Sequence, residues 1–196
     1  MWLVDPASNR VVRLLRLGRE TTSIAVGGGA AWIAAFANER KILSTSPPWT
    51  GASWLFSVKF GATGPQKQSY RLETGDTAGP SAVAVGYGKV WVLTCGTCNS
   101  GVDNQKLLEF DPDKRKVVKR IPLGSRNPNA LAVGAGSVWF ANQVNASVTQ
   151  LDPKTRRIVR TISVGEPGTA AICGIAASRD ALWVAVGNSM CEDTGG

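Results

Sequence analysis

The sequence predicts an all-β fold built from repeated four-stranded antiparallel units, and three observations support this prediction. A nine-residue pattern occurs three times, as "AVGGGAAWI" (25–33), "AVGYGKVWV" (84–92) and "AVGAGSVWF" (132–140). A second pattern, in which Asp-Pro precedes a basic and then a β-branched segment, also recurs. Finally, the chain has 22 glycines in 196 residues, a composition that favours short strands joined by tight turns.

The first pattern predicts a β-hairpin, whose strands we name A and B. A small-apolar run precedes a turn, and a second apolar run carrying a tryptophan follows it, which is the arrangement of two strands across a tight turn. The tryptophans recur at spacings of 59, 48 and 44 residues and are Trp32, Trp91, Trp139 and Trp183. In the first three copies the turn is expected to contain Gly27, Gly86 and Gly134. The fourth copy has "SRD" instead.

The second pattern predicts another hairpin, with strands C and D. Its copies are "WLVDPASNRVVRLLRLG" (2–18), "KLLEFDPDKRKVVKRIPLG" (106–124) and "SVTQLDPKTRRIVRTISVG" (147–165). Asp-Pro begins a turn, because the Asp side chain can accept a bond from the backbone two residues on and Pro presets φ. Asp111 and Asp152 are therefore predicted to have structural roles as turn formers, as is Asp5. Between Trp32 and Trp91 this hairpin is irregular, with strands expected at 54–60 and 67–75.

Together the two hairpins make a four-stranded unit of about 44 residues, which matches a β-propeller blade in length and strand count. Residues 1–18 are expected to be strands C and D of a first blade, followed by a blade at 22–75 with a loop insertion at 39–55. Further blades are expected at 81–124 and 129–165, and strands A and B of a last blade at 172–187. About four blades result, either as part of a larger ring or as a closed four-blade ring. The four tryptophans are expected to fill the gaps between blades, with ligand stacking as the alternative.

With "VGxGxVW" and "DPxTxxIVxTIxVG" in view, the chain resembles the YVTN-type and virginiamycin B lyase-like β-propeller repeat superfamily. The resemblance covers nearly the whole chain except 39–55 and the last few residues. It implies blades with strand A innermost and strand D outermost, usually six or seven in a ring. Members include a streptogramin-cleaving lyase, propellers attached to bacterial regulators and kinases, and surface proteins. The lyase works with a histidine and a magnesium ion, and no histidine here matches, so its activity is not carried over.

The composition of the chain excludes some classes of function. The chain has no histidine, which excludes Ser-His-Asp and Cys-His catalysis within it, and no catalytic residue is predicted. A lyase-like enzyme whose catalytic residues lie in missing blades stays open as the alternative. The net charge of +8 collects in 9–19, 113–120 and 154–160, which we interpret as solvated outer strands. Polyanion binding is a weaker alternative, and nucleic acid is not an expected partner. Apolar stretches stay below ten residues, so no membrane span is expected.

The cysteines suggest disulfides on one face of the blades. Cys95 and Cys98 follow strand B of one blade, Cys191 holds nearly the same place two blades on, and Cys173 precedes strand A of that later blade. Disulfides Cys95–Cys98 and Cys173–Cys191 are plausible there, and they would indicate an extracytoplasmic location. A four-thiolate zinc site, a redox role for "CGTC" and free thiols are the alternatives. The opening "MWLVDPASNR" does not resemble a signal peptide, so we expect the natural N-terminus to lie outside this sequence.

The same loops carry acidic residues, which form the candidate binding face. These residues are Glu39, Asp76, Asp103, Glu166, Glu192 and Asp193. Such a ring could hold a divalent cation or a basic ligand, although ordinary polar loops are the alternative; no cofactor and no metal site are predicted. The sequence thus favours a bacterial, extracytoplasmic, non-enzymatic binding module. Its loop-rich face would recognise a protein, a peptide or a small ligand, and the oligomeric state stays open.

Overall fold

The structure is a computed structural model that describes residues 1–38, 51–61, 64–75, 79–95, 105–124, 128–142 and 145–188. Its strands form three four-stranded and two two-stranded antiparallel sheets. Blade 1 comprises β3 (Glu20–Gly27), β4 (Ala30–Asn38), β5 (Gly51–Gly61) and β6 (Gly64–Gly75). Blade 2 comprises β7 (Gly79–Gly86), β8 (Lys89–Cys95), β9 (Lys106–Asp111) and β10 (Lys116–Pro122). Blade 3 comprises β11 (Pro128–Gly134), β12 (Ser137–Asn142), β13 (Ser147–Leu151) and β14 (Ile158–Ser163). The N-terminal hairpin is β1 (Trp2–Asp5) and β2 (Arg10–Leu14), and the C-terminal hairpin is β15 (Ala170–Ala177) and β16 (Leu182–Asn188).

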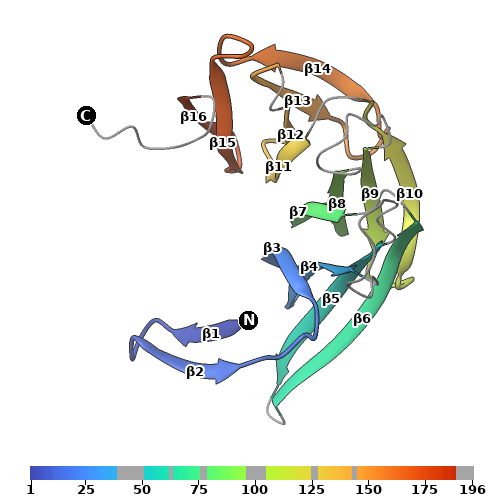
Figure 1. The fold of residues 1–196 in the computed structure, drawn as a ribbon, viewed down its shortest axis with the longest axis vertical. Coiled ribbons are helices and arrows are strands. Elements are labelled where there is room, and N and C mark those ends of the chain that lie inside the picture. Colours follow the sequence, from blue (N-terminus) through green and yellow to red (C-terminus); the bar gives the residue numbers. More distant parts are fainter. Residues whose placement is uncertain are drawn as a thin grey trace, which may run out of the picture.

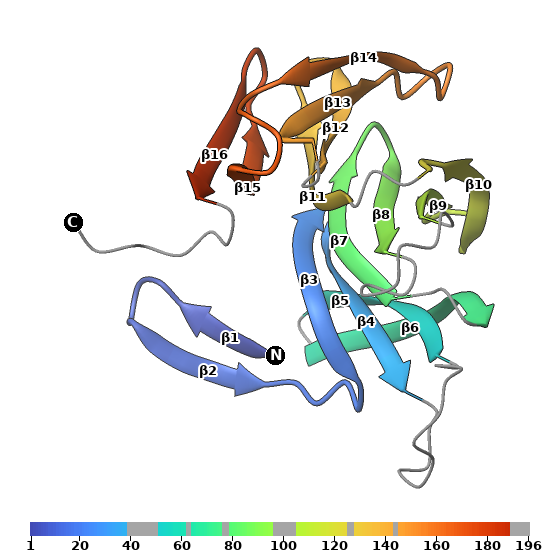
Figure 2. The same cartoon turned by 45° about the horizontal axis from the view of Figure 1, so that its top comes forward.

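The blades are arranged around a common centre as an open arc. Strands β3, β7 and β11 lie innermost, and β6, β10 and β14 lie at the rim (Figure 1). The two terminal hairpins stand at opposite ends of the arc and form separate sheets, as both views show (Figures 1 and 2). The predicted four-stranded units are thus present as three complete blades and two half-blades. The described chain is a partial ring, and the closed four-blade ring is not what it forms.

Blade 1 differs from the expectation at its insertion. The predicted loop at 39–55 included residues 51–55, but these belong to β5, which pairs with β4 from Asn38↔Gly51 to Ala31↔Val58. Strand C is therefore longer here than in the other blades, because it pairs along nearly the whole of β4. Residues 39–50 lie outside the described part of the chain.

The A–B turns also differ from the expectation in where their glycines act. Gly27, Gly86 and Gly134 are the last residues of their strands, and the turns are the pairs that follow. Both residues of each pair have positive φ, as type I′ hairpin turns require. The pairs are Gly28–Gly29 (59° and 72°), Tyr87–Gly88 (54° and 71°) and Ala135–Gly136 (47° and 75°). The strand-end glycines have a different role, which is to let neighbouring blades approach.

That close approach is visible at the contact between blade 3 and the C-terminal hairpin. The backbone N–H of Ala135 donates to the carbonyl oxygen of Ser178 at 2.8 Å. A Cβ on Gly134 would lie 2.5 Å from this same oxygen and 2.8 Å from the Cβ of Ala177. Gly27 and Gly86 are packed in the same way against Val85 and Val133 of the next blade. Glycine is required at this position because any side chain would separate the two blades.

Gly134→Ala is therefore expected to lower the free energy of unfolding by about 1–3 kcal/mol, the usual cost of overpacking. Urea denaturation followed by circular dichroism measures the change. Gly61→Ala is the matched control, because a Cβ on Gly61 would meet nothing within 4 Å. Equal losses in the two variants would contradict the role assigned to Gly134.

The apolar core is divided among the gaps between consecutive sheets, which we call seams. Seam 1, between blades 1 and 2, contains Trp32, Leu55, Val83 and Phe110 among its buried residues. Seam 2, between blades 2 and 3, forms a second cluster around Trp91 and Phe140. A smaller cluster packs Met1, Leu15 and Leu17, which flank the strands of the N-terminal hairpin, against blade 1. Another packs blade 3 against the C-terminal hairpin. Each blade is thus stabilised mainly by its neighbours, as in other repeat architectures.

Candidate functional site

The repeated tryptophan lines each seam. Trp32, Trp91 and Trp139 are 4%, 0% and 5% exposed. Each indole Nε1–H donates to the carbonyl oxygen of the strand-end glycine five residues earlier, at 3.1, 3.3 and 3.0 Å. Because this bond satisfies the only polar group of the ring, the rest of the indole presents an apolar wall to the next blade.

Trp183 occupies the same place in its hairpin but is 68% exposed. No blade of the described chain follows the C-terminal hairpin, so nothing covers this indole, in contrast to the expectation that all four tryptophans fill a seam. The opposite end of the arc shows the same effect. Val26 of β3 is 80% exposed, whereas its counterpart in blade 2, Val85, packs against Gly27 of the preceding blade.

In the Asp-Pro turns the aspartate side chains accept hydrogen bonds from the backbone of the turn, as the sequence pattern predicts. The carboxylate of Asp111 accepts from the backbone N–H of Asp113 and of Lys114, both at 3.0 Å. Asp152 accepts in the same way from Lys154 at 2.7 Å and Thr155 at 3.1 Å. These backbone bonds lower the pKa of both aspartates, because they stabilise the ionised form. Each turn then places one residue with positive φ, Arg115 (55°) or Arg156 (60°), beside the preceding blade.

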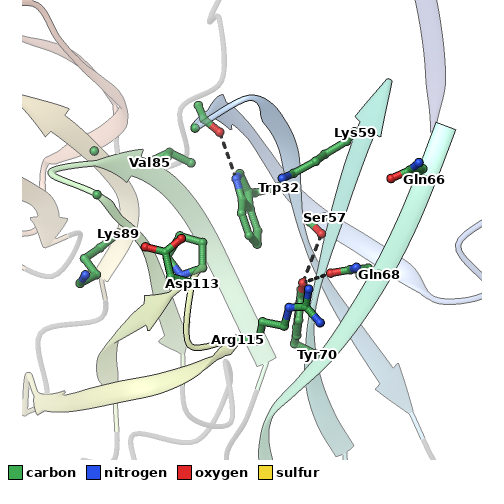
Figure 3. Close-up of a pocket in the computed structure, with 15 residues that line it drawn as sticks. Trp32, Ser57, Lys59, Gln66, Gln68, Tyr70, Val85, Lys89, Asp113 and Arg115 are labelled. Carbon is green, nitrogen blue, oxygen red and sulfur yellow. Dashed lines mark hydrogen bonds between the residues drawn. The ribbon is translucent and has the colours of Figure 1, made fainter. Parts of the chain in front are cut away.

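A pocket of about 750 Å³ opens at seam 1, between blade 1 and blade 2 (Figure 3). Its mouth is formed by the A–B turns of the two blades and the C–D turn of blade 2. Its apolar surface comes from Trp32, Val85 and Pro112. Trp32, Tyr70 and Phe110 also contact one another, with ring centroids 4.8–6.3 Å apart, so the aromatic lining is packed.

The polar lining of this pocket is cationic. Among the described residues that line it, Lys59, Lys89 and Arg115 are cations and Asp113 is the one carboxylate. Lys89 is paired with Asp111 at 3.2 Å. Among the described residues, Lys59 and Arg115 have neither an ion pair nor a side-chain hydrogen bond.

Hydroxyl and amide groups lie near these cations. The Tyr70 hydroxyl donates to Oε1 of Gln68 at 2.5 Å and lies 3.5 Å from Oγ of Ser57. Figure 3 shows the polar ends of Tyr70, Gln68 and Arg115 directed toward one another. The pocket therefore combines uncompensated positive charge with neutral hydrogen-bonding groups and an aromatic wall.

Seam 2 has a different arrangement at the corresponding place. Arg156 donates from Nε to Oε2 of Glu109 at 2.5 Å and from Nη2 to Oε1 at 2.9 Å. Glu109 is only 1% exposed, so its carboxylate depends on this pair. Its hydrogen bonds and negative charge raise the pKa of Arg156. Here the guanidinium of one blade is neutralised by a carboxylate of the preceding blade.

Of the predicted acidic face, the structure describes only Glu166, which does not line the pocket. Glu166 is exposed in the loop between β14 and β15, where its carbonyl oxygen accepts from the backbone N–H of Ala170 at 3.0 Å. The other members of this face lie outside the described residues, and these are Glu39, Asp76, Asp103, Glu192 and Asp193. Within the described ranges, no three or more His, Cys, Asp or Glu side chains are grouped so that they could hold a metal ion.

Among the cysteines, Cys173 is disulfide-bonded. The side chains of Cys95, Cys98 and Cys191 lie outside the described part, so the pairs Cys95–Cys98 and Cys173–Cys191 stay predictions. The outer strands β2 and β14 are exposed at every residue, so the basic segments that they carry face solvent. The part of the chain that the structure describes contains no helix of the length and apolarity needed to cross a membrane.

Sequence reasoning missed the pocket residues, although a weak signal existed. The strand C residue that pairs across the sheet with the tryptophan of strand B differs between the blades. It is Glu109 in blade 2, Gln150 in blade 3 and Ser57 in blade 1. Only blade 1 has a short side chain there, and its strands C and D follow the irregular copy of the repeat. An alignment of the three strand C segments would have shown this difference.

Comparison with solved structures shows which known folds this architecture resembles. The chain resembles the structure titled U3-55K with a TM-score of 0.56 at 12% identity, covering 90% of this chain and 48% of that one. It resembles the RRP9 WD40 repeats with a TM-score of 0.56 at 11% identity, covering 90% and 47%. The Neurospora crassa Pan2 WD40 domain gives a TM-score of 0.52 at 11% identity, covering 86% and 44%.

The fold is a partial β-propeller. The chain spans about half the length of the propellers that it resembles, and this agrees with the open arc of blades. At these identities the likeness shows the fold alone. No model of a known protein family matches the chain, and no curated protein matches it.

Proposed function

We propose that this partial propeller is a non-enzymatic binding module whose recognition site is the pocket at seam 1. The pocket carries the proposal: about 750 Å³ of space is walled by two blades. It combines an aromatic surface with two cations, Lys59 and Arg115, that have no partner among the described residues. This volume lies in the range of small-molecule sites, which are concave and largely apolar with a few placed polar groups. A short peptide segment or a small ligand fits this description.

The position of the pocket supports a rigid site. Much of its wall comes from β4, β5, β6 and β7, which are held by ladder pairing and by the seam cluster around Trp32 and Phe110. The C–D turn that carries Arg115 is held by the hydrogen bonds of Asp111. Sites on regular elements keep their geometry better than sites on loops. The acidic face predicted from the sequence stays a second candidate surface for recognition.

Membership of the YVTN and virginiamycin B lyase-like superfamily and an extracytoplasmic location are part of this proposal. The repeated "VGxGxVW" and "DPxTxxIVxTIxVG" patterns support the first. The disulfide at Cys173 supports the second, because such bonds persist mainly in oxidising compartments.

Indole N–H resonances in two-dimensional NMR test the pocket as the recognition site. Capped acidic, basic and neutral polar amino acids serve as probes, and the peaks are assigned with Trp32→Phe and Trp139→Phe. At least one probe class is expected to shift the Trp32 resonance without shifting that of Trp139, which makes the same hydrogen bond in another seam. If no probe class shifts Trp32, or if every probe shifts both resonances equally, the proposal is wrong.

A further inference from the structure

We propose that the seam 1 pocket recognises a carboxylate, which pairs with Arg115. This inference rests on the proposed function, because it assigns a ligand chemistry to the same pocket. Its support comes from comparing two seams of one chain. In both seams an arginine of a C–D turn lies against the preceding blade, but the strand C residue paired with the tryptophan is Ser57 in blade 1 and Glu109 in blade 2.

The cation occupies the same place in both seams. Arg115 and Arg156 each stand four residues after the aspartate of an Asp-Pro turn, with φ of 55° and 60°. In each case the turn lies against the preceding blade. In seam 2 the carboxylate of Glu109, from the preceding blade, pairs with Arg156.

The strand C position that faces this arginine is also equivalent in the two blades. Glu109 of β9 pairs across the sheet with Trp91, and Ser57 of β5 pairs in the same way with Trp32. Blade 1 thus presents a hydroxyl where blade 2 presents a carboxylate. Because serine is shorter than glutamate, Ser57 offers the guanidinium of Arg115 no carboxylate. It also leaves open space that is part of the pocket.

The other charges around Arg115 favour an anion. Lys59 adds a second cation that has no partner among the described residues. Lys89 is already paired with Asp111 at 3.2 Å, and Asp113 is the one carboxylate in the lining. The lining therefore carries three cations against one anion, and one of those cations is already committed.

The geometry favours a carboxylate in particular. A guanidinium presents two parallel N–H groups that match the two oxygens of a carboxylate, and Arg156 shows this pairing in seam 2. A methylene stem attached to the group would face the apolar side chain of Val85 and the ring of Trp32, whose N–H is already bonded to Gly27. The carboxylate can belong to an acidic side chain of a peptide or to a free small acid, because both present the same group.

Titration with two probes tests the inference and separates these sources. The probes are the capped peptide acetyl-Ala-Glu-Ala-amide and free glutarate, and the glutamine version of the peptide is the uncharged control. Both carboxylates are expected to shift the Trp32 indole resonance, and the glutamine peptide is expected to bind at least several-fold more weakly. Tighter binding of the peptide points to a side chain in a polypeptide, and tighter binding of glutarate points to a free acid.

Arg115→Ala is expected to weaken carboxylate binding about tenfold, the low end for a charge-assisted hydrogen bond, because Arg115 is exposed. Lys114→Ala is the matched control, since it removes the same charge from the same turn but not from the pocket lining. It is expected to leave binding within twofold, the change expected of distant exposed charges. Equal losses in the two variants would show only a general charge effect and would overturn the inference.

Ser57→Glu restores in blade 1 the residue that blade 2 has. The new carboxylate is expected to pair with Arg115 and abolish binding of both probes, while the far-ultraviolet circular dichroism stays that of the wild type. Retained carboxylate binding in a folded Ser57→Glu variant overturns the inference; if the variant does not fold, the Arg115 and Lys114 pair decides. Shifts of Trp32 with basic or neutral probes only would refute the carboxylate and leave the proposed function standing.

Discussion

Trp91→Ala is expected to lower the free energy of unfolding by about 3–5 kcal/mol, the usual cost of removing a buried large aromatic side chain. Trp91 is fully buried and packs in seam 2 with residues of blade 2 and blade 3, including Leu107 and Phe140. The change leaves a cavity between two blades and removes the hydrogen bond to the carbonyl oxygen of Gly86. Urea denaturation monitored by circular dichroism gives the loss.

Trp183→Ala is the matched control for this prediction. It removes the same side chain from the same position of a hairpin, but Trp183 is 68% exposed. We expect a change within about 0.5 kcal/mol, as for most surface substitutions. A comparable loss in both variants would mean that the tryptophan stabilises its own hairpin and not the seam.

Arg156→Ala is expected to cost about 3–5 kcal/mol, the range for leaving one member of a buried ion pair alone, and to lie at the lower end. The carboxylate of Glu109 is 1% exposed and would lose both hydrogen bonds that Arg156 donates. The lower end is expected because the side chain of Arg156 is itself 37% exposed, so that water can enter when it is removed. Thermal and urea unfolding both report this loss.

Two further variants separate the orphaned charge from other causes. Arg157→Ala removes the adjacent exposed cation and is expected to change stability by no more than about 0.5 kcal/mol. Adding Glu109→Gln to Arg156→Ala is expected to recover most of the loss, because Gln150 stands at the same position in blade 3. Failure of the double variant to recover stability would show that Arg156 acts through packing and not through the carboxylate.

Local sequence predicted the blades well because blade hairpins depend on local chemistry. Alternating apolar residues, Asp-Pro turns and glycine-containing turns led to the correct antiparallel order within blade 2 and blade 3. The errors have the same origin. Gly27, Gly86 and Gly134 were assigned to turns, although a contact with the next blade requires them. Residues 51–55 were assigned to a loop insertion, although they pair with β4.

The candidate site was less accessible to sequence reasoning, because its residues belong to different blades. Ser57 and Arg115 are each unremarkable in their own segment. Their relation appears only when Glu109 and Arg156 are seen to form the equivalent pair in seam 2. The acidic loops drew attention because they differ between repeats, but the pocket lies at the other ends of the strands.

The sequence by itself determined the unit of construction: a four-stranded blade with a tryptophan on strand B, a tight turn before it and, in most copies, an Asp-Pro turn between strands C and D. These features depend on neighbours within a few residues or on the adjacent strand. The tertiary structure decided which of the repeated tryptophans are buried and which of the repeated arginines have an ion-pair partner. Trp91 and Trp183 hold the same position on strand B, yet one is buried and the other exposed. Arg156 is paired with Glu109, whereas Arg115 has no ion pair among the described residues. The physical reason is that burial and ion pairing at a seam depend on the blade next to it.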